Sequence, residues 1–354
     1  MTSQEVDDMS NLTNNTTALQ ELLDKANALS APKASPNGTE WTQSNVTSGT
    51  FSGVAFGNGL WVAAGDTALW KSTDGKTWTE ISSTNGYSWT NVFFAGDCWF
   101  ACAYSSGLWY SNDGETWTRT IPAGNYNTVC YANGLWVVGL RGGAYGIAYC
   151  ADGEANWNTA EFSEGGLYSI YCIYNANGIW VAGYSSGLYY STDAMTWTTS
   201  NITSGTFYTV YNANGIWVAG SDAGLYYSTD GMTWTQSNIT SGTFEVVHYA
   251  NGVWVTGATL TGGLSSLRYS LDGMTWTSSG YYLGQAYKAI HNASGIWVTG
   301  GSDGLGSVGY STDGMIWAGS NLYQAALLYA VYNANGIWVA GSDNGLYYSV
   351  TWEP

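Results

Sequence analysis

The chain has 354 residues, a formal net charge of −17 and only eight Lys and Arg residues. Nucleic-acid binding depends on clustered basic side chains, so this composition argues against nucleic acid as a partner. No apolar stretch approaches the ~20 residues of a membrane-spanning helix, and the polar, acidic start MTSQEVDDMS does not resemble a signal peptide. We therefore expect no membrane insertion and no signal peptide, and we interpret the acidity as a source of solubility for an aromatic-rich surface.

Residues 1–30 differ in composition from the rest of the chain because they contain neither Trp nor Gly. Apolar or small residues recur at spacings of three and four, as in a short heptad seam: Met9, Leu12, Thr16, Leu19, Leu23 and Ala26. A helix of this length is marginal alone in water and needs a partner. We predict an oligomerising or attachment helix, the alternative being a helix packed on its own domain or an ordered tail. Residues 31–38 contain two prolines and are interpreted as a linker to a domain over residues 39–354.

Residues 211–235, YNANGIWVAGSDAGLYYSTDGMTWT, show the unit that the rest of the chain repeats. The first Trp of each unit recurs at steps of 37 to 44 residues, at positions 61, 99, 136, 180, 217, 254, 297 and 338. A period near 40 with four short strands is typical of a β-propeller blade. We expect strand A over residues 207–211, B over 216–219, C over 225–227 and D over 232–235, with Asn-Gly type I′ turns between A and B.

The spacing also predicts how the ring closes. Trp41 lies 20 residues before Trp61, as Trp197 lies before Trp217, so Trp41 occupies a strand D position. The last unit has strands A, B and C but no fourth strand of its own. We therefore expect residues 39–44 to complete the last blade, which hides both sheet edges. The fold class is all-β, an eight-bladed propeller of four-stranded antiparallel blades, with seven blades as the alternative.

Between strands C and D the units carry Ser/Thr-x-Asp-Gly-x-Thr-Trp, as in residues 228–234. This motif resembles the Asp-box of the sialidase-like (BNR) propeller superfamily. The resemblance implies a structural role, in which Asp and Ser satisfy backbone groups of the turn and Trp packs between sheets. The aspartates concerned are Asp74, Asp113, Asp152, Asp193, Asp230, Asp272 and Asp313.

In that family the functional site lies on the face formed by the B–C and D–A loops, which we call the loop face. Here these loops differ most between units, and the B–C connections are longer in blades 3, 6 and 7. Aromatic rings beside a few polar groups suit sugar binding, because the rings stack on sugars and the hydroxyls need hydrogen bonds. The candidate ligand-binding residues are Tyr87, Trp89, Arg141, Tyr145, Arg268, Tyr281, Tyr282 and Asp303.

The sequence gives little support for an enzyme. A sialidase needs an arginine triad, but the three arginines of this chain do not match the family pattern, so no catalytic residue is carried over. A glycoside hydrolase needs two suitably spaced carboxylates. Asp222, Asp303 and Asp343 recur in the same B–C loop, which repetition explains better than catalysis does. His248 and His291 occupy the Tyr211 position and are interpreted as variants of that tyrosine, so we expect no metal site and no cofactor.

Repeats of this kind, behind a short helix and a linker, resemble bacteriophage fibre or appendage proteins. The resemblance implies a homo-oligomer, usually a trimer, that attaches through residues 1–30 to other virion proteins. The propeller would then bind host cell-surface glycans or another receptor. The alternatives are a structural virion or scaffold protein that makes protein–protein contacts, and a glycoside hydrolase acting on bacterial polysaccharide. Assembly in the host cytoplasm and location in the virion fit a chain without a signal peptide.

Overall fold

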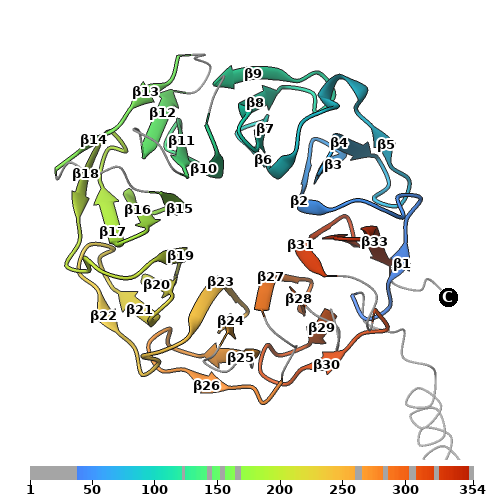
Figure 1. Cartoon of the computed structure of the whole chain (residues 1–354). Helices are drawn as coiled ribbons and strands as arrows, with labels where there is room; N and C mark the ends of the chain where they lie inside the picture. Colours follow the sequence, from blue (N-terminus) through green and yellow to red (C-terminus); the bar gives the residue numbers. More distant parts are fainter. Residues whose placement is uncertain are drawn as a thin grey trace, which may run out of the picture. The chain divides into compact units, whose positions relative to one another are not determined.

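The computed structural model describes residues 38–121, 124–141, 146–151, 156–163, 169–259, 265–281, 286–302, 308–322 and 327–350. These residues form eight sheets arranged as the blades of one β-propeller (Figure 1). The eight-bladed prediction is therefore confirmed. The predicted helix of residues 1–30 lies outside the described residues.

Each blade has four strands, which we letter A to D from the central channel outward. Strands A are β2 (Phe51–Gly57), β6 (Trp89–Ala95), β10 (Tyr126–Ala132), β15 (Ile170–Ala176), β19 (Phe207–Ala213), β23 (Thr243–Ala250), β27 (Ala286–Ala293) and β31 (Leu328–Ala334). Strands B are β3 (Leu60–Gly65), β7 (Cys98–Ala103), β11 (Leu135–Leu140), β16 (Ile179–Tyr184), β20 (Ile216–Ser221), β24 (Val253–Thr259), β28 (Ile296–Ser302) and β32 (Ile337–Ser342).

The outer half of each blade is shorter. Strands C are β4 (Leu69–Ser72), β8 (Gly107–Ser111), β12 (Ile147–Ala151), β17 (Gly187–Ser191), β21 (Gly224–Ser228), β25 (Ser265–Ser270), β29 (Val308–Ser311) and β33 (Gly345–Val350). Strands D are β5 (Thr79–Glu80), β9 (Thr118–Ile121), β13 (Asn158–Thr159), β18 (Thr196–Thr199), β22 (Thr235–Gln236), β26 (Thr277–Ser278), β30 (Ala318–Gly319) and β1 (Thr42–Gln43). A two-residue strand, β14 (Glu161–Phe162), adds in parallel to β18, and a 3-10 turn, η1 (Ser82–Thr84), follows β5.

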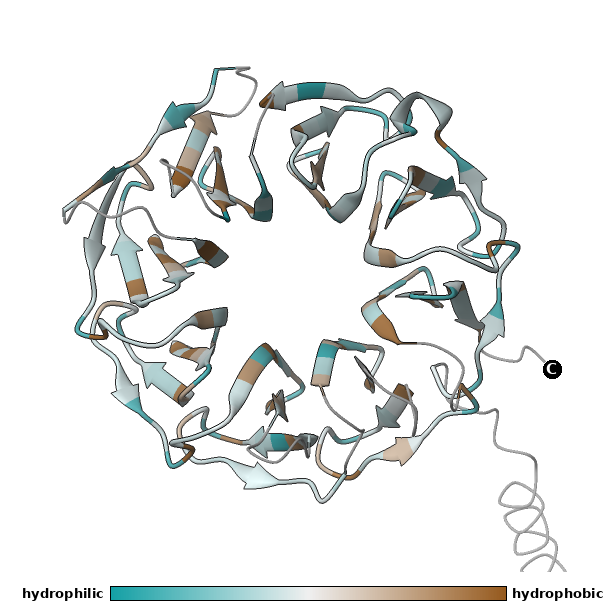
Figure 2. Ribbon diagram, viewed as in Figure 1, coloured by the Kyte–Doolittle hydropathy of each residue, from teal (hydrophilic) through white to brown (hydrophobic). Residues whose placement is uncertain are grey.

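The apolar core lies between consecutive blades. One cluster joins Val181 and Leu188 of blade 4 to Phe207 and Trp217 of blade 5. Figure 2 shows that hydrophobic residues recur in the inner strands of the blades. The first Trp of every unit is at most 4% exposed, so each repeat contributes one large buried ring to this layered core.

The A–B turns have the geometry that the Asn-Gly pairs predict. Asn214 and Gly215 have φ values of 51° and 77°, and both signs are those of a type I′ turn. The predicted span of strand D was wrong at its start. Met232 and Thr233 lie in the Asp-box turn because their backbone N–H groups donate to Asp230, and β22 begins only at Thr235.

The N-terminal strand closes the ring, as the Trp spacing predicted. Strand β1 pairs antiparallel with β33, with Thr42 opposite Tyr348 and Gln43 opposite Tyr347. It is shorter than the predicted 39–44. Trp41, just before it, is 5% exposed and packs in the core between blades 7 and 8. The outer edge of β33 is therefore covered.

Candidate functional site

Every strand A contains a β-bulge near its start. In blade 5, Phe207 pairs with Ser221 and Thr209 with Gly220, which leaves Tyr208 without a residue opposite it. The same shift occurs in all eight blades. A bulge frees one residue from the ladder and re-aims its side chain. The eight bulged residues, which we call the bulge ring, are Ser52, Thr90, Asn127, Tyr171, Tyr208, Glu245, Lys288 and Tyr329.

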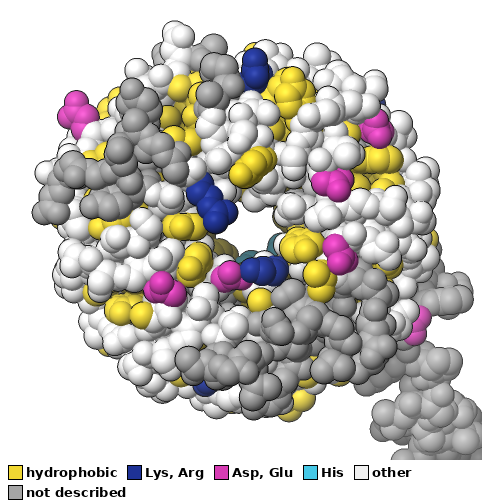
Figure 3. All heavy atoms as spheres, viewed as in Figure 1, with side chains coloured by type: hydrophobic (Ala, Val, Ile, Leu, Met, Phe, Trp, Pro, Cys, Tyr) yellow, Lys and Arg dark blue, Asp and Glu magenta, His cyan; other side chains and the backbone are white. Residues whose placement is uncertain are grey.

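The bulge ring lies at the loop-face mouth of the channel, since each member comes at the start of an innermost strand. Two pairs of neighbouring members contact each other across blades. The rings of Tyr171 and Tyr208 meet edge to face with centroids 5.3 Å apart, and Lys288 forms an ion pair with Glu245. Figure 3 shows charged and hydrophobic side chains together around the central opening.

Arg141, from the B–C connection of blade 3, extends the mouth. Its guanidinium lies 5.7 Å from the ring centroid of Tyr171, a cation–π distance. Burial and the nearby Asp222 carboxylate raise the pKa of Tyr208 above its ordinary value of 10, so its phenol is a hydrogen-bond donor at neutral pH. Burial and Asp343 act in the same direction on the pKa of Tyr329. The mouth thus offers aromatic faces, hydroxyl donors and both signs of charge.

A pocket of about 390 Å³ opens beside Arg141. Its walls come from blades 2 to 4 and include two members of the bulge ring, Thr90 and Asn127. The remaining lining residues are Tyr104, Asn125, Tyr126 and Ser169. Tyr104 is 62% exposed, so its ring is available to a ligand. This volume suits a small ligand group such as one or two sugar rings.

The structure separates the residues that the sequence suggested for this face. Arg141 lies at the pocket. Trp89 is 1% exposed, and Tyr87 packs on it and on Trp109, so both belong to the core between blades 1 and 2.

Two further candidates lie inside the blades. Arg268 lies within β25, opposite Thr256 and Ser278, and its Nε atom is buried. Tyr281 stacks near Trp317 and covers Gly309, a strand C position at which five other blades carry Trp or Tyr. Tyr145, Tyr282 and Asp303 lie outside the described residues. Of the described candidates, only Arg141 lines the pocket at the mouth.

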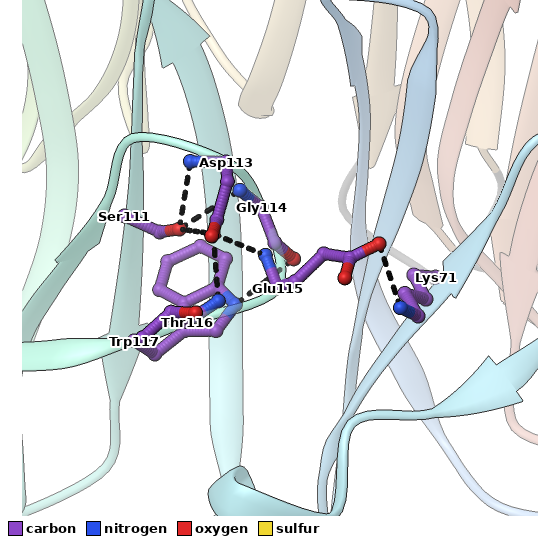
Figure 4. Close-up of polar contacts among 7 residues, drawn as sticks. All are labelled: Lys71, Ser111, Asp113, Gly114, Glu115, Thr116 and Trp117. Atoms are coloured by element: carbon purple, nitrogen blue, oxygen red, sulfur yellow. Dashed lines mark hydrogen bonds and ion pairs between the residues drawn. The ribbon is translucent and has the colours of Figure 1, made fainter.

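The Asp-box aspartates hold turns on the opposite face. In blade 2, Asp113 accepts the backbone N–H groups of Glu115 and Thr116 at 2.8 and 2.6 Å, as well as the Ser111 hydroxyl (Figure 4). The same bonds recur at Asp74, Asp193, Asp230, Asp272 and Asp313. Asp152 lies outside the described residues. These hydrogen bonds lower the pKa of Asp113 to about 2, the N–H of Thr116 being the largest contribution. Carboxylates whose Oδ1 accepts three hydrogen bonds within their own turn are structural.

The two histidines line the middle of the channel. Their ring centroids are 5.5 Å apart, and each contacts a tyrosine of the neighbouring blade. Burial lowers the pKa of both to about 4, so both are neutral at pH 7. Within the described part of the chain, no group of three or more His, Cys, Asp or Glu side chains has the geometry of a metal site.

These features define the chain as an eight-bladed β-propeller with a polar and aromatic channel mouth. No family model matches it, and no curated protein sequence matches it either. Among solved structures, 88% of the chain superposes on all of the computationally designed Ika8 protein, with a TM-score of 0.69 and 13% identity. It also matches 99% of YCF48 bound to D1 peptide, over 91% of its own length, with a TM-score of 0.58 and 16% identity.

A third similar structure is Sqt1 from Saccharomyces cerevisiae. The superposition covers 90% of this chain and all of Sqt1, with a TM-score of 0.65 and 9% identity. At such identities the likeness shows the fold alone. In the described residues, no helix is long and apolar enough to cross a membrane.

Proposed function

We propose that this chain is a non-enzymatic recognition protein whose bulge ring and adjoining pocket bind a cell-surface glycan. The observation that carries the proposal is the bulge ring itself. In this layer the eight copies differ widely in chemical type, from Ser52 through Tyr208 to Lys288. Residues that stabilise the blades recur in each unit because every blade needs the same contacts. Residues that select a ligand are under no such constraint and can differ between units.

The chemistry of the mouth matches a carbohydrate. Tyr171 and Tyr208 supply faces on which the apolar side of a sugar ring can stack. Glu245 and Lys288, already paired with each other, supply an acceptor and a donor for hydroxyl groups. Arg141 adds a fork of donors at the pocket, which favours a sugar that carries a carboxylate or several adjacent hydroxyls.

The carboxylates on this face support binding more than hydrolysis. Glu245 is engaged by Lys288. Asp222 and Asp343 each accept a backbone N–H of the neighbouring D–A loop, from Thr206 and Leu327 at 3.0 and 2.8 Å. A glycoside hydrolase needs one carboxyl group free to donate a proton and a second opposite it. We therefore place the hydrolase alternative second, to be tested by turnover of bacterial polysaccharides.

The finer proposal is a fibre or appendage protein of a bacteriophage virion, in the Asp-box propeller class. It is supported by the repeated motif and by the helix predicted in residues 1–30. A trimer would present three mouths at once, and several weak glycan contacts would add up to strong attachment. The alternative is a protein–protein contact; one propeller of similar fold, YCF48, is bound to a peptide.

The decisive experiment is a glycan array on the full chain, followed by calorimetry with the best glycan. We expect Tyr208→Ala and Arg141→Ala to weaken binding at least tenfold. Tyr227→Ala, which removes an equal side chain from strand C, should leave the affinity unchanged. Binding to no glycan, or equal losses in all three variants at unchanged melting temperature, would contradict the proposal. Capture of a peptide instead would favour the alternative.

A further inference from the structure

Five aromatic rings form a continuous ladder along the channel wall, one layer deeper than the bulge ring. They are Tyr174, Tyr211, His248, His291 and Tyr332, from five consecutive blades. Successive ring centroids lie 5.0, 5.4, 5.5 and 5.1 Å apart. Such distances are those of aromatic rings in direct contact. The ladder therefore has a regular step of about one ring per blade.

Ala55 interrupts the ladder in blade 1. It pairs with Val62 just as Tyr332 pairs with Val339 in blade 8, so the two residues occupy equivalent positions. Phe93 holds the same position in blade 2, opposite Phe100. The aromatic side chains of blades 8 and 2 are thus separated by a single methyl group where every step from blade 4 to blade 8 has a ring.

A cavity of about 310 Å³ lies at this interruption. Ala55, Phe93 and Tyr332 all line it. The rest of the wall is mostly aromatic or aliphatic and includes Phe56, Phe94, Tyr131 and Trp136. Asn91 contributes a polar edge. The volume is at the lower end of the range of about 300–1,000 Å³ that holds small molecules in proteins.

We propose that this cavity binds a small planar aromatic molecule, whose ring takes the ladder position of Ala55 between Tyr332 and Phe93. The ladder geometry selects a flat ring, because the neighbouring steps are set by ring-to-ring contacts. The lining favours one or two fused rings with at most one polar group, which would face Asn91. This site is separate from the glycan mouth, since Ala55 lies three residues beyond the bulged Ser52 on the same strand.

Aromatic selectivity in the unchanged protein gives the first test. Phenol and 5-fluoroindole serve as planar probes and cyclohexanol as a non-planar control of similar size and polarity. By ¹⁹F NMR for the indole and calorimetry for all three, we expect saturable binding of the planar probes. Cyclohexanol should bind at least tenfold more weakly than phenol. Absence of binding, or equal affinity for phenol and cyclohexanol, would overturn the proposal without any variant.

Two substitutions then locate the site. Ala55→Phe completes the ladder, so it should weaken 5-fluoroindole binding at least tenfold while the melting temperature stays the same or rises. Tyr208→Ala, at the mouth, should leave 5-fluoroindole binding unchanged but weaken the glycan. An unchanged indole affinity in folded Ala55→Phe would overturn the aromatic site. If Ala55→Phe fails to fold, Tyr332→Leu provides the same test, because it removes one stacking face and should weaken the indole several-fold. The glycan proposal and the aromatic-site proposal can therefore be refuted independently of each other.

Discussion

The side-chain amide of Asn321 makes two hydrogen bonds with the backbone of Trp41, although 280 residues separate the two. The N–H of Trp41 donates to Asn321 Oδ1 at 2.7 Å, and Asn321 Nδ2 donates to the Trp41 carbonyl at 3.3 Å. The same reciprocal pair joins Asn45 to Trp78, Asn201 to Trp234 and Asn238 to Trp276. In each pair the side-chain amide of an Asn in a D–A loop bonds the backbone N–H and carbonyl of the Trp that ends the C–D turn of the following blade. We call this the Asn latch.

The latch predicts a measurable contribution to stability. Asn238→Ala removes both bonds to Trp276 and leaves two backbone groups of that residue without their partner. We expect a loss of about 1–3 kcal/mol in the free energy of unfolding, measured by urea denaturation. Asn158→Ala, at an exposed position, is the control and should change stability by less than about 0.5 kcal/mol. Equal effects of the two substitutions would show that the latch does not stabilise the ring.

Ring closure predicts a second stability effect. Trp41→Ala should destabilise the protein by roughly 3–5 kcal/mol, because Trp41 is buried and holds the strand that covers β33. Deleting residues 1–44 removes that strand altogether and should lower the melting temperature and promote aggregation through the open edge. Deleting residues 1–36 keeps β1 and is the matched control. A melting temperature unaffected by the longer deletion would refute closure by this strand.

Much of this fold could be predicted from the sequence, because a propeller repeats its local signals. The spacing from Trp41 to Trp61 was enough to predict the shared last blade, and the Asn-Gly pairs gave the A–B turns. The bulge ring could not be predicted in the same way. Strict alternation along strand A would put Tyr208 in a regular ladder, and only the pairing of Phe207 and Thr209 with strand B shows that Tyr208 is left out.

The candidate site was predicted less well for a related reason. The sequence predicts Tyr87 and Trp89 as loop aromatics, but nothing in it distinguishes a ring that faces solvent from one that fills the space between blades. One signal in the sequence is the variation at the strand A position where Tyr208 corresponds to Glu245 and Lys288. Comparing the repeats column by column shows this variation, although it does not show that the residue is bulged.

The two histidines predict a pH dependence of stability between about pH 4 and 6.5. Burial lowers their pKa to about 4 in the folded state, against an ordinary value of 6.5. The unfolded chain therefore binds protons first, and the free energy of unfolding should fall as pH drops from 6.5 and level off below 4. The loss is as much as about 3 kcal/mol for each imidazole. The chain contains no other histidine, so His248→Tyr with His291→Tyr should abolish this slope in urea titrations. A slope that persists in the double variant would rule out these residues as its source.

The Asp-box predicts a separate effect in stronger acid. The pKa of Asp113 is lowered to about 2 by the hydrogen bonds from Thr116 and Glu115. The contribution of the ionised Asp113 carboxylate to the free energy of unfolding is complete above about pH 4 and is lost as pH falls toward 2. Asp113→Asn should therefore lower stability at pH 7 by about 1 kcal/mol, a value reduced by solvent screening, and the difference should vanish near pH 2. Glu115→Gln is the control, because it keeps the backbone N–H that donates to Asp113 and removes only the charge of a surface ion pair with Lys71 at 2.7 Å. A constant difference across the pH range would contradict the assignment.

The eight bulges have a consequence for how such a protein can diversify. A bulged residue has no residue opposite it, so exchanging its side chain leaves the pairing of strands A and B intact. Eight positions around one opening can thus change while the architecture stays the same. Randomising only these eight codons would give a library of altered specificities on one unaltered framework.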